Sequence, residues 1–297
     1  MRVFVTGATG FVGSAVVQEL IGTGHKVLGL ARSEAGAASL TATGAEVHRG
    51  SLEDLDSLAA GARACDGVIH TGFNHDFSKF AANCELDKNA IEALGKALAG
   101  SDRPLIVTSG TGLLTPGKLV TEDTAAPANH PTIPRVSEQT AFAMLSKGVH
   151  ASVVRLPPSV HGDGDHGFVP MVIGFARAKG VSAYIGDGLN RWPAVHRLDA
   201  AQVYRLALEK GTAGARYHAI AEEGLPFRDI AEVIGRRLKL PVVSKTPEEA
   251  AAHFEWFAHF AAINNLASSQ KTREQLGWQP KHPGLIADLD RPRYFET

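Results

Sequence analysis

The sequence predicts an α/β fold, in which a doubly wound parallel sheet carries a smaller lobe built from the C-terminal part of the chain. Two observations predict it. Apolar runs of strand length alternate with helical segments as far as about residue 157, and beyond it glycine- and proline-rich loops alternate with short helices. Because strands separated by helices at this spacing run parallel, we expect a sheet domain at 1–157, joined by later strands from the C-terminal half, and a lobe at 158–297.

Six apolar runs are the expected strands of the sheet domain. Between the first two, the segment "FVGSAVVQELIGTG" has apolar residues at helical spacing and ends on glycines, a common stop signal for helices. In the lobe, "FRDIAEVIGRRL" predicts a helix over 227–238. "EEAAAHFEWFAHF" predicts one packed amphipathic helix over 248–260, and a wall of the substrate pocket is the alternative. The expected strands are 3–6, 26–31, 46–49, 67–71, 104–109 and 152–156.

Three glycines stand at three-residue intervals where the first expected strand gives way to the first helix. A tight turn, the close approach of a diphosphate and close packing of helix on strand each need a residue without a Cβ. The helix N-terminus that follows offers unpaired N–H groups to phosphate. The pattern therefore predicts a dinucleotide site, and a tight turn without a ligand is the alternative. The expected contacts are Gly7, Thr9, Gly10, Phe11, Val12 and Gly13.

The end of the second expected strand indicates which dinucleotide is bound. An acidic residue there holds the two ribose hydroxyls of NAD, whereas an arginine accommodates the 2′-phosphate of NADP. Arg32 followed by Ser33 occupies this position, and a guanidinium binds phosphate through paired donors. We therefore expect NADP(H) to be preferred over NAD(H). The alternative is that Arg32 is solvated and that Glu34 binds the ribose.

Seven segments carry a resemblance to the extended and atypical short-chain dehydrogenase/reductase superfamily, which includes NAD(P)-dependent epimerases, dehydratases and 3β-hydroxysteroid-dehydrogenase-like reductases. They are "VTGATGFVGSAVVQEL", "RGSLED", "GVIHTGF", "LIVTSGTG", "VVRLPPSVHG", "WPAVHRLDAA" and "REQLGWQPK", and they span nearly the whole chain. The resemblance implies a Rossmann-type sheet domain and an NAD(P) cofactor. It also implies cofactor contacts from Leu52, Asp54, His70, Thr71, Gly72, Thr108, Leu156 and Pro157.

The chain departs from this superfamily where the proton is transferred. Members that oxidise or reduce a carbinol carbon use a tyrosine with a lysine four residues later, because the cation lowers the pKa of the phenol. The fourth residue after Tyr184, Tyr204 and Tyr217 is Gly188, Leu208 and Ala221, and Tyr294 is too near the end. The tyrosine–lysine pair is therefore absent.

Other residues stand where this pair is expected. If Glu138 matches the glutamate that follows the tyrosine by eight residues, His130 replaces the tyrosine and Pro134 the lysine, with Arg135 next to it. A histidine donates a proton near neutral pH. An arginine only hydrogen-bonds, because its pKa is too high. The alternative is that both belong to an exposed proline-bounded loop.

Members of the superfamily also use the hydroxyl of a Ser or Thr at the end of the fifth or sixth strand, which helps the tyrosine. This helper hydroxyl is displaced in the present sequence. In "VTSGTG" its position is taken by Gly110, which leaves Ser109 and Thr111 on either side as candidates to orient a substrate oxygen. The alternative is that both hydroxyls satisfy backbone groups in a turn. Without a strong acid, hydride transfer requires a substrate that is already activated, such as an iminium, an imine or a conjugated alkene.

The lobe carries two further candidate segments. "HGDGDHG", residues 161–167, combines histidines with aspartates, but its spacing matches no standard zinc or calcium loop, so no metal is expected. In "GDGLNRWPAVHRLDAA", the resemblance implies that Arg191 and Trp192 line the substrate pocket, and that His196 and Asp199 tie the two parts of the chain together.

Composition excludes several classes of partner. The chain has 30 Lys+Arg against 31 Asp+Glu and no run of five like charges, so nothing favours nucleic acid or an anionic membrane. No apolar stretch reaches the length of a membrane span, and Arg2 is followed by a strand-like run rather than a secretory signal. We expect a cytoplasmic homodimer that acts on a small molecule.

These observations together predict an NADP-preferring oxidoreductase that transfers hydride to a carbonyl or carbonyl-like carbon of a small, largely uncharged molecule. Two alternatives stay open. One is an NADP(H)-binding sensor with little turnover, and the other is a sugar-nucleotide epimerase or dehydratase, which would depend on the missing tyrosine.

Overall fold

The computed structural model describes residues 1–114, 116–127 and 133–296 and contains a seven-stranded parallel sheet. Its strand order is β11-β7-β5-β4-β1-β2-β3, and every neighbouring pair is parallel. The order reverses between β1 and β4, and open sheets of this kind bind ligands at such a point. The strands are β1 Arg2–Thr6, β2 Lys26–Ala31, β3 Glu46–Arg49, β4 Gly67–His70, β5 Ser101–Gly110, β7 Val149–Leu156 and β11 Arg216–His218.

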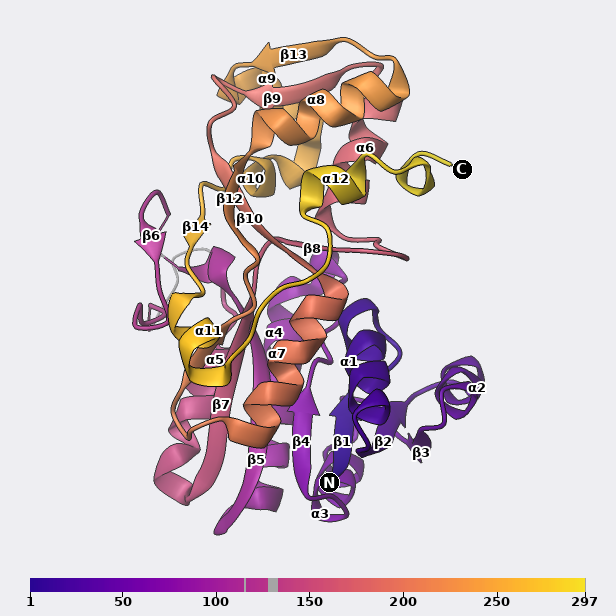
Figure 1. Ribbon diagram of the computed structural model, residues 1–297, viewed down its shortest axis with the longest axis vertical. Coiled ribbons are helices and arrows are strands. Elements are labelled where there is room, and N and C mark those ends of the chain that lie inside the picture. Colours follow the sequence, from indigo (N-terminus) through magenta and orange to yellow (C-terminus); the bar gives the residue numbers. More distant parts are fainter. Residues whose placement is uncertain (115, 128–132, 297) are drawn as a thin grey trace.

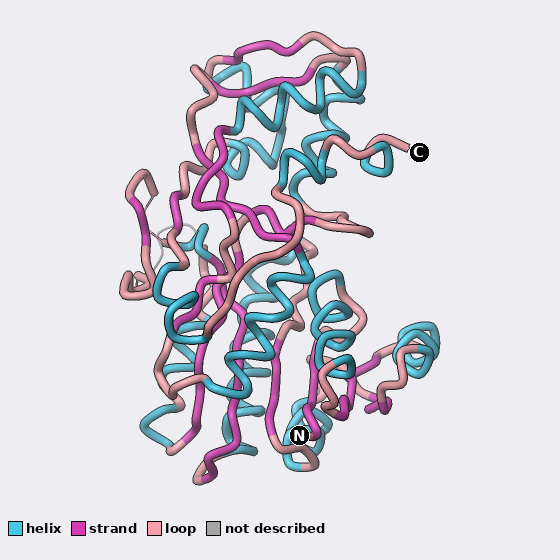
Figure 2. Tube along the Cα trace, viewed as in Figure 1, coloured by secondary structure: helices cyan, strands magenta, loops and turns pink. Residues whose placement is uncertain are grey.

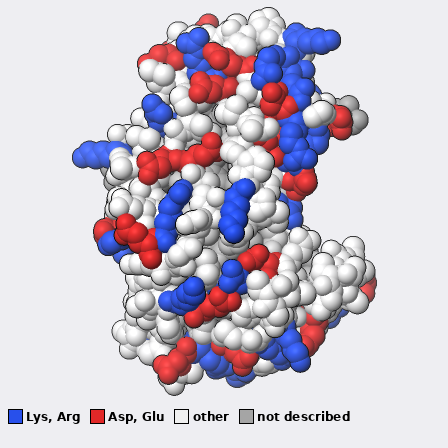
Figure 3. All heavy atoms as spheres, viewed as in Figure 1, with Lys and Arg blue, Asp and Glu red and all other residues white. Residues whose placement is uncertain are grey.

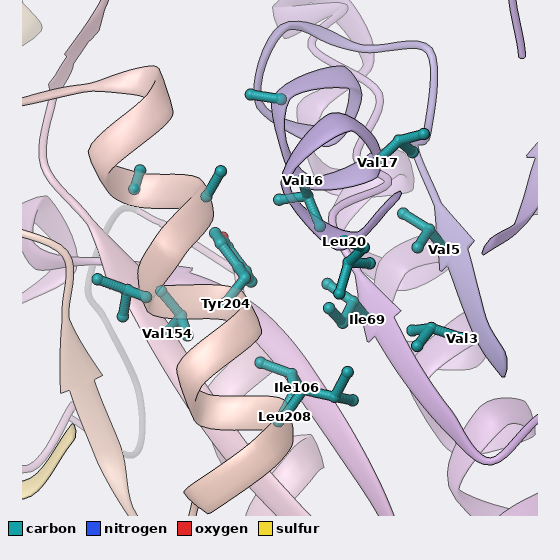
Figure 4. Packing of buried hydrophobic residues seen from close by; sticks show 14 of the residues in the cluster. Val3, Val5, Val16, Val17, Leu20, Ile69, Ile106, Val154, Tyr204 and Leu208 are labelled. Atoms are coloured by element: carbon teal, nitrogen blue, oxygen red, sulfur yellow. The ribbon is translucent and has the colours of Figure 1, made fainter. Parts of the chain in front are cut away.

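Helices cover both faces of this sheet (Figure 1). Side chains alternate between faces along a strand, so Val3 and Val5 of β1 pack with α1 and α7, while Phe4 packs with α3, α4 and α5. Figure 4 shows Val3 and Val5 on the side of α1, and Tyr204 and Leu208 of α7 next to Val154 and Ile106. The helices are α1 Phe11–Gly22, α2 Glu34–Ala42, α3 Leu55–Arg63, α4 Phe80–Leu98, α5 Ser137–Ala143, α7 Arg197–Lys210 and α11 Gln270–Leu276.

A smaller lobe lies beyond the carboxyl ends of the strands, and the described C-terminal end belongs to it (Figures 1 and 2). Its own core is aromatic and includes Trp192, Phe227, Phe254 and Phe257. Its strands are β8 Ser159–His161, β10 Arg191–His196 and β12 Glu222–Pro226 in one sheet, β9 Ser182–Ile185 with β13 Val242–Lys245, and β14 Leu266–Ala267 with β6 Leu119–Val120. Its helices are α6 Phe168–Lys179, α8 Phe227–Leu238, α9 Pro247–Phe254, α10 Ala258–Ala261 and α12 Leu285–Leu289.

The predicted fold class is confirmed, and each expected strand is present with small shifts at its ends. The segment Arg216–His218 adds the edge strand β11, so part of the sheet comes from the C-terminal half. Helix α8 has the predicted bounds. The single helix predicted over 248–260 is wrong: Glu255 has a φ of 52°, a left-handed conformation that breaks the segment into α9, a 3₁₀ turn and α10.

The lobe is tied to the sheet domain through the first turn of α7. His196 caps this helix, and the carboxylate of Asp199 accepts hydrogen bonds from the backbone N–H groups of Lys281 and His282. Acidic and basic side chains occur in both parts on the face drawn in Figure 3. None of the helices within the described ranges is long and apolar enough to cross a membrane.

Candidate functional site

The turn between β1 and α1 is shaped by its glycines. Gly7 has a φ of 65°, and a Cβ there would lie 2.7 Å from the backbone N of Gly72 and the carbonyl carbon of Thr71. A Cβ on Gly13 would lie 2.0 Å from the carbonyl oxygen of Gly7. Real Cβ atoms do not approach backbone atoms so closely, so glycine is required at both positions. The glycine turn therefore packs directly against the segment that follows β4.

The N-terminus of α1 is free to bind an anion. Gly10 is its N-cap, no side chain caps it, and its first turn contains no acidic residue. Unpaired N–H groups and the positive end of the helix dipole favour phosphate here. Thr9 is exposed, and Phe11 and Val12 are half-buried. This end of the sheet thus fits the diphosphate of a dinucleotide.

The residues expected at the adenosine end lie around the carboxyl ends of β2 and β3. Ser33 caps α2 by accepting a hydrogen bond from the N–H of Gly36, and Asp54 caps α3 in the same way. The exposed carboxylate of Glu34 is paired with Arg49. Arg32 is exposed and forms no ion pair or hydrogen bond within the described part of the chain. The free cation here is therefore Arg32, while Glu34 is already engaged.

Leu52, which is expected at the adenosine end, lies close to the segment that follows β4. Its Cδ2 atom lies 3.1 Å from the position that a Cβ on Gly72 would take. The segment after β3 is thus stacked on the segment after β4, and the bare Gly72 leaves room for that contact.

A buried chain of polar groups runs from β1 to the start of α5. His70 is almost fully buried; its Nδ1 lies 2.7 Å from the Oγ1 of Thr6 and its Nε2 3.1 Å from the Oδ1 of Asp87. The other oxygen of Asp87 accepts a hydrogen bond from Ser137, whose Oγ accepts one from the Nε of Arg135 at 2.9 Å. His70 is therefore linked to Arg135 through Asp87 and Ser137.

The pKa of Asp87 is set by these hydrogen-bonded polar groups and by its burial. Burial alone would raise the pKa of its carboxyl, but the hydrogen bond from His70 and the charge of Arg135 outweigh burial and lower the pKa below its usual value. Asp87 is therefore a carboxylate, and it compensates the charge of Arg135, whose Nε lies 4.0 Å from the Oδ2 of Asp87.

Arg135, which stands in the sequence next to the position of the missing lysine, contacts the end of β5 and the segment after β4. One of its Nη atoms donates to the carbonyl oxygen of Thr108 at 3.3 Å, and its guanidinium lies 4.1 Å from the ring centroid of Phe73. The hydroxyl of Thr108 donates to the carbonyl of His70 and contacts the hydroxyl of Tyr204. His130, the other candidate here, lies outside the described residues.

The two candidate hydroxyls after β5 have different surroundings. Ser109 lines a cavity of about 10 Å³, the size of about one water molecule, together with Leu113, Ala126, Pro127, Arg135 and Gln139. Its hydroxyl makes no hydrogen bond to the described residues. Thr111 is fully buried, and its hydroxyl donates to the side chain of Asn265 at 2.7 Å. The structure therefore brings Ser109, not Thr111, beside Arg135.

The lobe residues also differ from expectation. Trp192 is fully buried in the lobe core against Phe227, so it does not line an open pocket. Arg191 is half-buried and donates to the carbonyl of Gly224. At the end of β7, Leu156 is half-buried and Pro157 is buried. Leu156 pairs in register with Gly110, which sets it beside the end of β5.

Aromatic side chains close the space between the sheet domain and the lobe. We call Phe73, Phe77, Phe80, Trp256 and Phe260 the aromatic wall. The ring of Phe77, in the loop after β4, lies 5.3 Å from that of Trp256 and 5.5 Å from that of Phe260. Phe73 lies between Phe80 and the guanidinium of Arg135. The surface next to Arg135 is therefore aromatic, and the ring of His75, which packs on Phe73, adds a polar edge to it.

Sequence reasoning missed Asp87, Ser137 and Asn265. These residues act through partners up to 154 positions away, and no local spacing marks them. Across 1–114, 116–127 and 133–296 there is no group of three or more His, Cys, Asp or Glu residues that could hold a metal ion. In "HGDGDHG", His161 pairs instead with Asp288 at 2.9 Å.

Comparisons with known proteins agree with this geometry. The model of the family described as "NAD dependent epimerase/dehydratase family" matches residues 3–221. "Uncharacterized protein C2A9.02" of Schizosaccharomyces pombe is 54% identical over 297 residues, covering 99% of this chain and 100% of that protein. "Sterol-4-alpha-carboxylate 3-dehydrogenase, decarboxylating" of Dictyostelium discoideum is 30% identical, covering 76% of this chain and 73% of that protein.

A solved structure shows the same fold. The dTDP-glucose 4,6-dehydratase DesIV of Streptomyces venezuelae, with NAD and TYD bound, superposes with a TM-score of 0.79. The two chains are 20% identical, and the match covers 99% of this chain and 97% of that one.

Proposed function

The chain belongs to the NAD dependent epimerase/dehydratase family, and we propose that within this family it is an NADP-preferring reductase of a small, largely uncharged carbonyl-like compound. Its family and relatives make it an NAD(P)-dependent enzyme of the oxidoreductase type. The observation that carries the proposal is the contrast between a complete glycine turn and a proton-transfer region that lacks the tyrosine–lysine pair and brings Arg135 and Ser109 to one small cavity.

The residues beside this site indicate the kind of substrate. When bound, the reduced nicotinamide supplies a hydride. We infer that Arg135 and Ser109, whose hydroxyl has no hydrogen-bond partner among the described residues, hydrogen-bond the oxygen or nitrogen atom that polarises the accepting carbon. A guanidinium stabilises negative charge but does not give up its proton near neutral pH. The site therefore suits a substrate that needs polarisation more than proton donation by the enzyme, such as an activated ketone, an imine that is already protonated or a conjugated alkene. Water supplies the proton that completes the reduction of the ketone or the alkene.

The aromatic wall supports an uncharged, apolar substrate. Phe73 presents its ring to the guanidinium of Arg135, Phe77 and Phe260 extend the wall away from it, and Trp256 at its outer end is 52% exposed. Burying rings and alkyl groups against such a surface is favourable, whereas burying an unpaired charge is costly. A nucleotide sugar, with two phosphates, is the less suitable occupant of this space.

The direct test of the proposed activity is consumption of NADPH. Purified protein is titrated with NADPH and NADH, and absorbance of the reduced nicotinamide is then followed with ketones, aldehydes, imines, activated alkenes and a nucleotide sugar. We expect turnover with one of the uncharged classes. Binding of NADPH without turnover of any compound would favour a cofactor sensor, and tight binding of the nucleotide sugar would favour an epimerase or dehydratase.

NADP preference is proposed from Arg32 alone. Its guanidinium is exposed and unpaired beside the expected 2′-phosphate, while Glu34 is engaged by Arg49. We expect Arg32→Ala to weaken NADPH binding about tenfold or more, since a charge-assisted phosphate contact is lost, and to leave NADH binding unchanged. Arg63→Ala is the matched control, because Arg63 is also exposed but lies at the C-terminal end of α3, away from the Asp54 cap. Equal effects of Arg32→Ala on both dinucleotides would contradict the preference.

A further inference from the structure

Arg197, the first residue of α7, reaches from the lobe side to the glycine turn. One Nη donates to the carbonyl oxygen of Asp163 at 2.7 Å, and the other makes a long 3.4 Å contact with the Oγ of Ser14 in the first turn of α1. Its guanidinium lies 4.9 Å from the ring centroid of Phe11. Phe11 is the first residue of α1, so this cation stands beside the helix end that suits the diphosphate.

The charge of Arg197 has no ion-pair partner within 1–114, 116–127 and 133–296. Among the described residues no carboxylate forms an ion pair with it, and the nearby carboxylate of Asp163 is taken by Arg291 and Arg293. Burial lowers the pKa of the Arg197 guanidinium, and no neighbouring acid opposes this effect. A guanidinium has five N–H donors, and here only two contacts use them. A half-buried cation of this kind is stabilised by an anion.

The loop after β8 is shaped around this side chain. Gly162 has a φ of 139°, and a Cβ there would lie 2.8 Å from the Cγ of Arg197. From the same loop, the ring of His166 packs 5.7 Å from the ring of Phe11. Phe11 thus touches both Arg197 and His166. In the segment 161–167, which matches no metal loop, the glycine at 162 is therefore explained by the space that Arg197 needs.

We propose that Arg197 binds the diphosphate of the dinucleotide, so that the lobe loop 162–167, which packs on Arg197 and Phe11, borders the bound cofactor. The proposal rests on the proposed function, because it takes a dinucleotide as the ligand of the glycine turn. It adds a cationic contact from outside the sheet domain to the N–H groups of α1. The ligand chemistry is the two linked phosphates, which NADPH and NADH share.

The test measures affinity rather than turnover. Equilibrium dissociation constants of wild type and Arg197→Gln are measured by calorimetry for NADPH, NADH, ADP-ribose and AMP. We expect Arg197→Gln to weaken NADPH, NADH and ADP-ribose by about tenfold each, since one charge-assisted contact is lost, and to leave AMP unchanged. Arg197→Lys should recover part of the loss because it keeps the charge.

Arg205→Gln is the matched control. Arg205 lies two turns later on α7 and ties this helix to α1 through Glu19, so its loss tests whether loosening the two helices is enough to reduce affinity. Arg205→Gln should bind all four ligands like wild type.

Three results would overturn the proposal. They are NADPH affinity in Arg197→Gln within twofold of wild type, an equal loss for AMP and ADP-ribose, and an equal loss in Arg205→Gln. Wild type that binds neither NADPH nor NADH would overturn the proposed function itself.

Discussion

Two regions at the carboxyl edge of one sheet are built in different ways. The glycine turn after β1 is held by the backbone: Gly7 and Gly13 are in contact distance of neighbouring main-chain atoms, so only one residue type fits. The region between β5 and α5 is held by side chains, through Asp87, Ser137 and Arg135. The first region therefore accepts almost no substitution, while the second can exchange its chemistry and keep its fold.

The largest effect is expected at Gly13. A valine there would place Cβ and two methyl groups into the carbonyl of Gly7, which is 2.0 Å from the Cβ position, so the turn must open. We expect Gly13→Val to reduce affinity for NADPH by at least about 100-fold, because the diphosphate contacts depend on the turn. Calorimetric titration measures the change, and circular dichroism checks the fold.

Gly22→Ala is the control on the same helix. A Cβ on Gly22 meets nothing within 4 Å, and alanine favours the helix by about 0.5–1 kcal/mol. This variant should bind NADPH normally and unfold at a slightly higher temperature. If Gly13→Val bound NADPH normally, the glycine turn would tolerate substitution, and it would not differ in this respect from the region between β5 and α5.

The same contrast explains what the sequence could predict. The spacing of Gly7, Gly10 and Gly13 predicts the turn, because the three residues are close in sequence and the constraint on them comes from the main chain. The role of Thr111 could not be predicted from the sequence, because its hydroxyl donates a hydrogen bond to Asn265, which lies 154 residues away. Burial of Trp192 was also not readable, because the segment around it looks like a loop until the lobe core forms around it.

An intermediate effect is expected at Arg135. Arg135→Ala removes the guanidinium beside Ser109 but leaves the glycine turn intact, so we expect turnover to fall by about 100-fold, within the range seen when one stabilising donor is removed, with the NADPH dissociation constant within about threefold of wild type. Single-turnover kinetics with the substrate found in the panel measures this split.

Arg135→Lys separates charge from shape. A lysine keeps the positive charge but cannot donate to Ser137 and to the carbonyl of Thr108 in the same geometry, so we expect only partial recovery of turnover. Full activity in Arg135→Ala would show that this region does not take part in the chemistry.

The smallest effect is expected at Asp87, and it tests whether the second region is held by charge. The pKa of Asp87 is lowered in the folded protein, so its contribution to stability is fully present above the unfolded value, 3.8. That contribution is lost as the pH falls below this value through the lower folded pKa. We expect Asp87→Asn to lower the free energy of unfolding at pH 7 by about 2 kcal/mol, the scale of hydrogen bonds to a charged group.

The pH dependence distinguishes a charge from a simple packing defect. If the carboxylate stabilises His70 and Arg135 electrostatically, the difference in unfolding free energy between wild type and Asp87→Asn, measured with urea, should be constant from pH 7 to about 5 and should narrow towards pH 3. A difference that stays the same down to pH 3 would mean that Asp87 acts through shape alone. In that case Arg135 would be placed by its contacts with Ser137, Thr108 and Phe73, and turnover by Asp87→Asn should equal that of wild type.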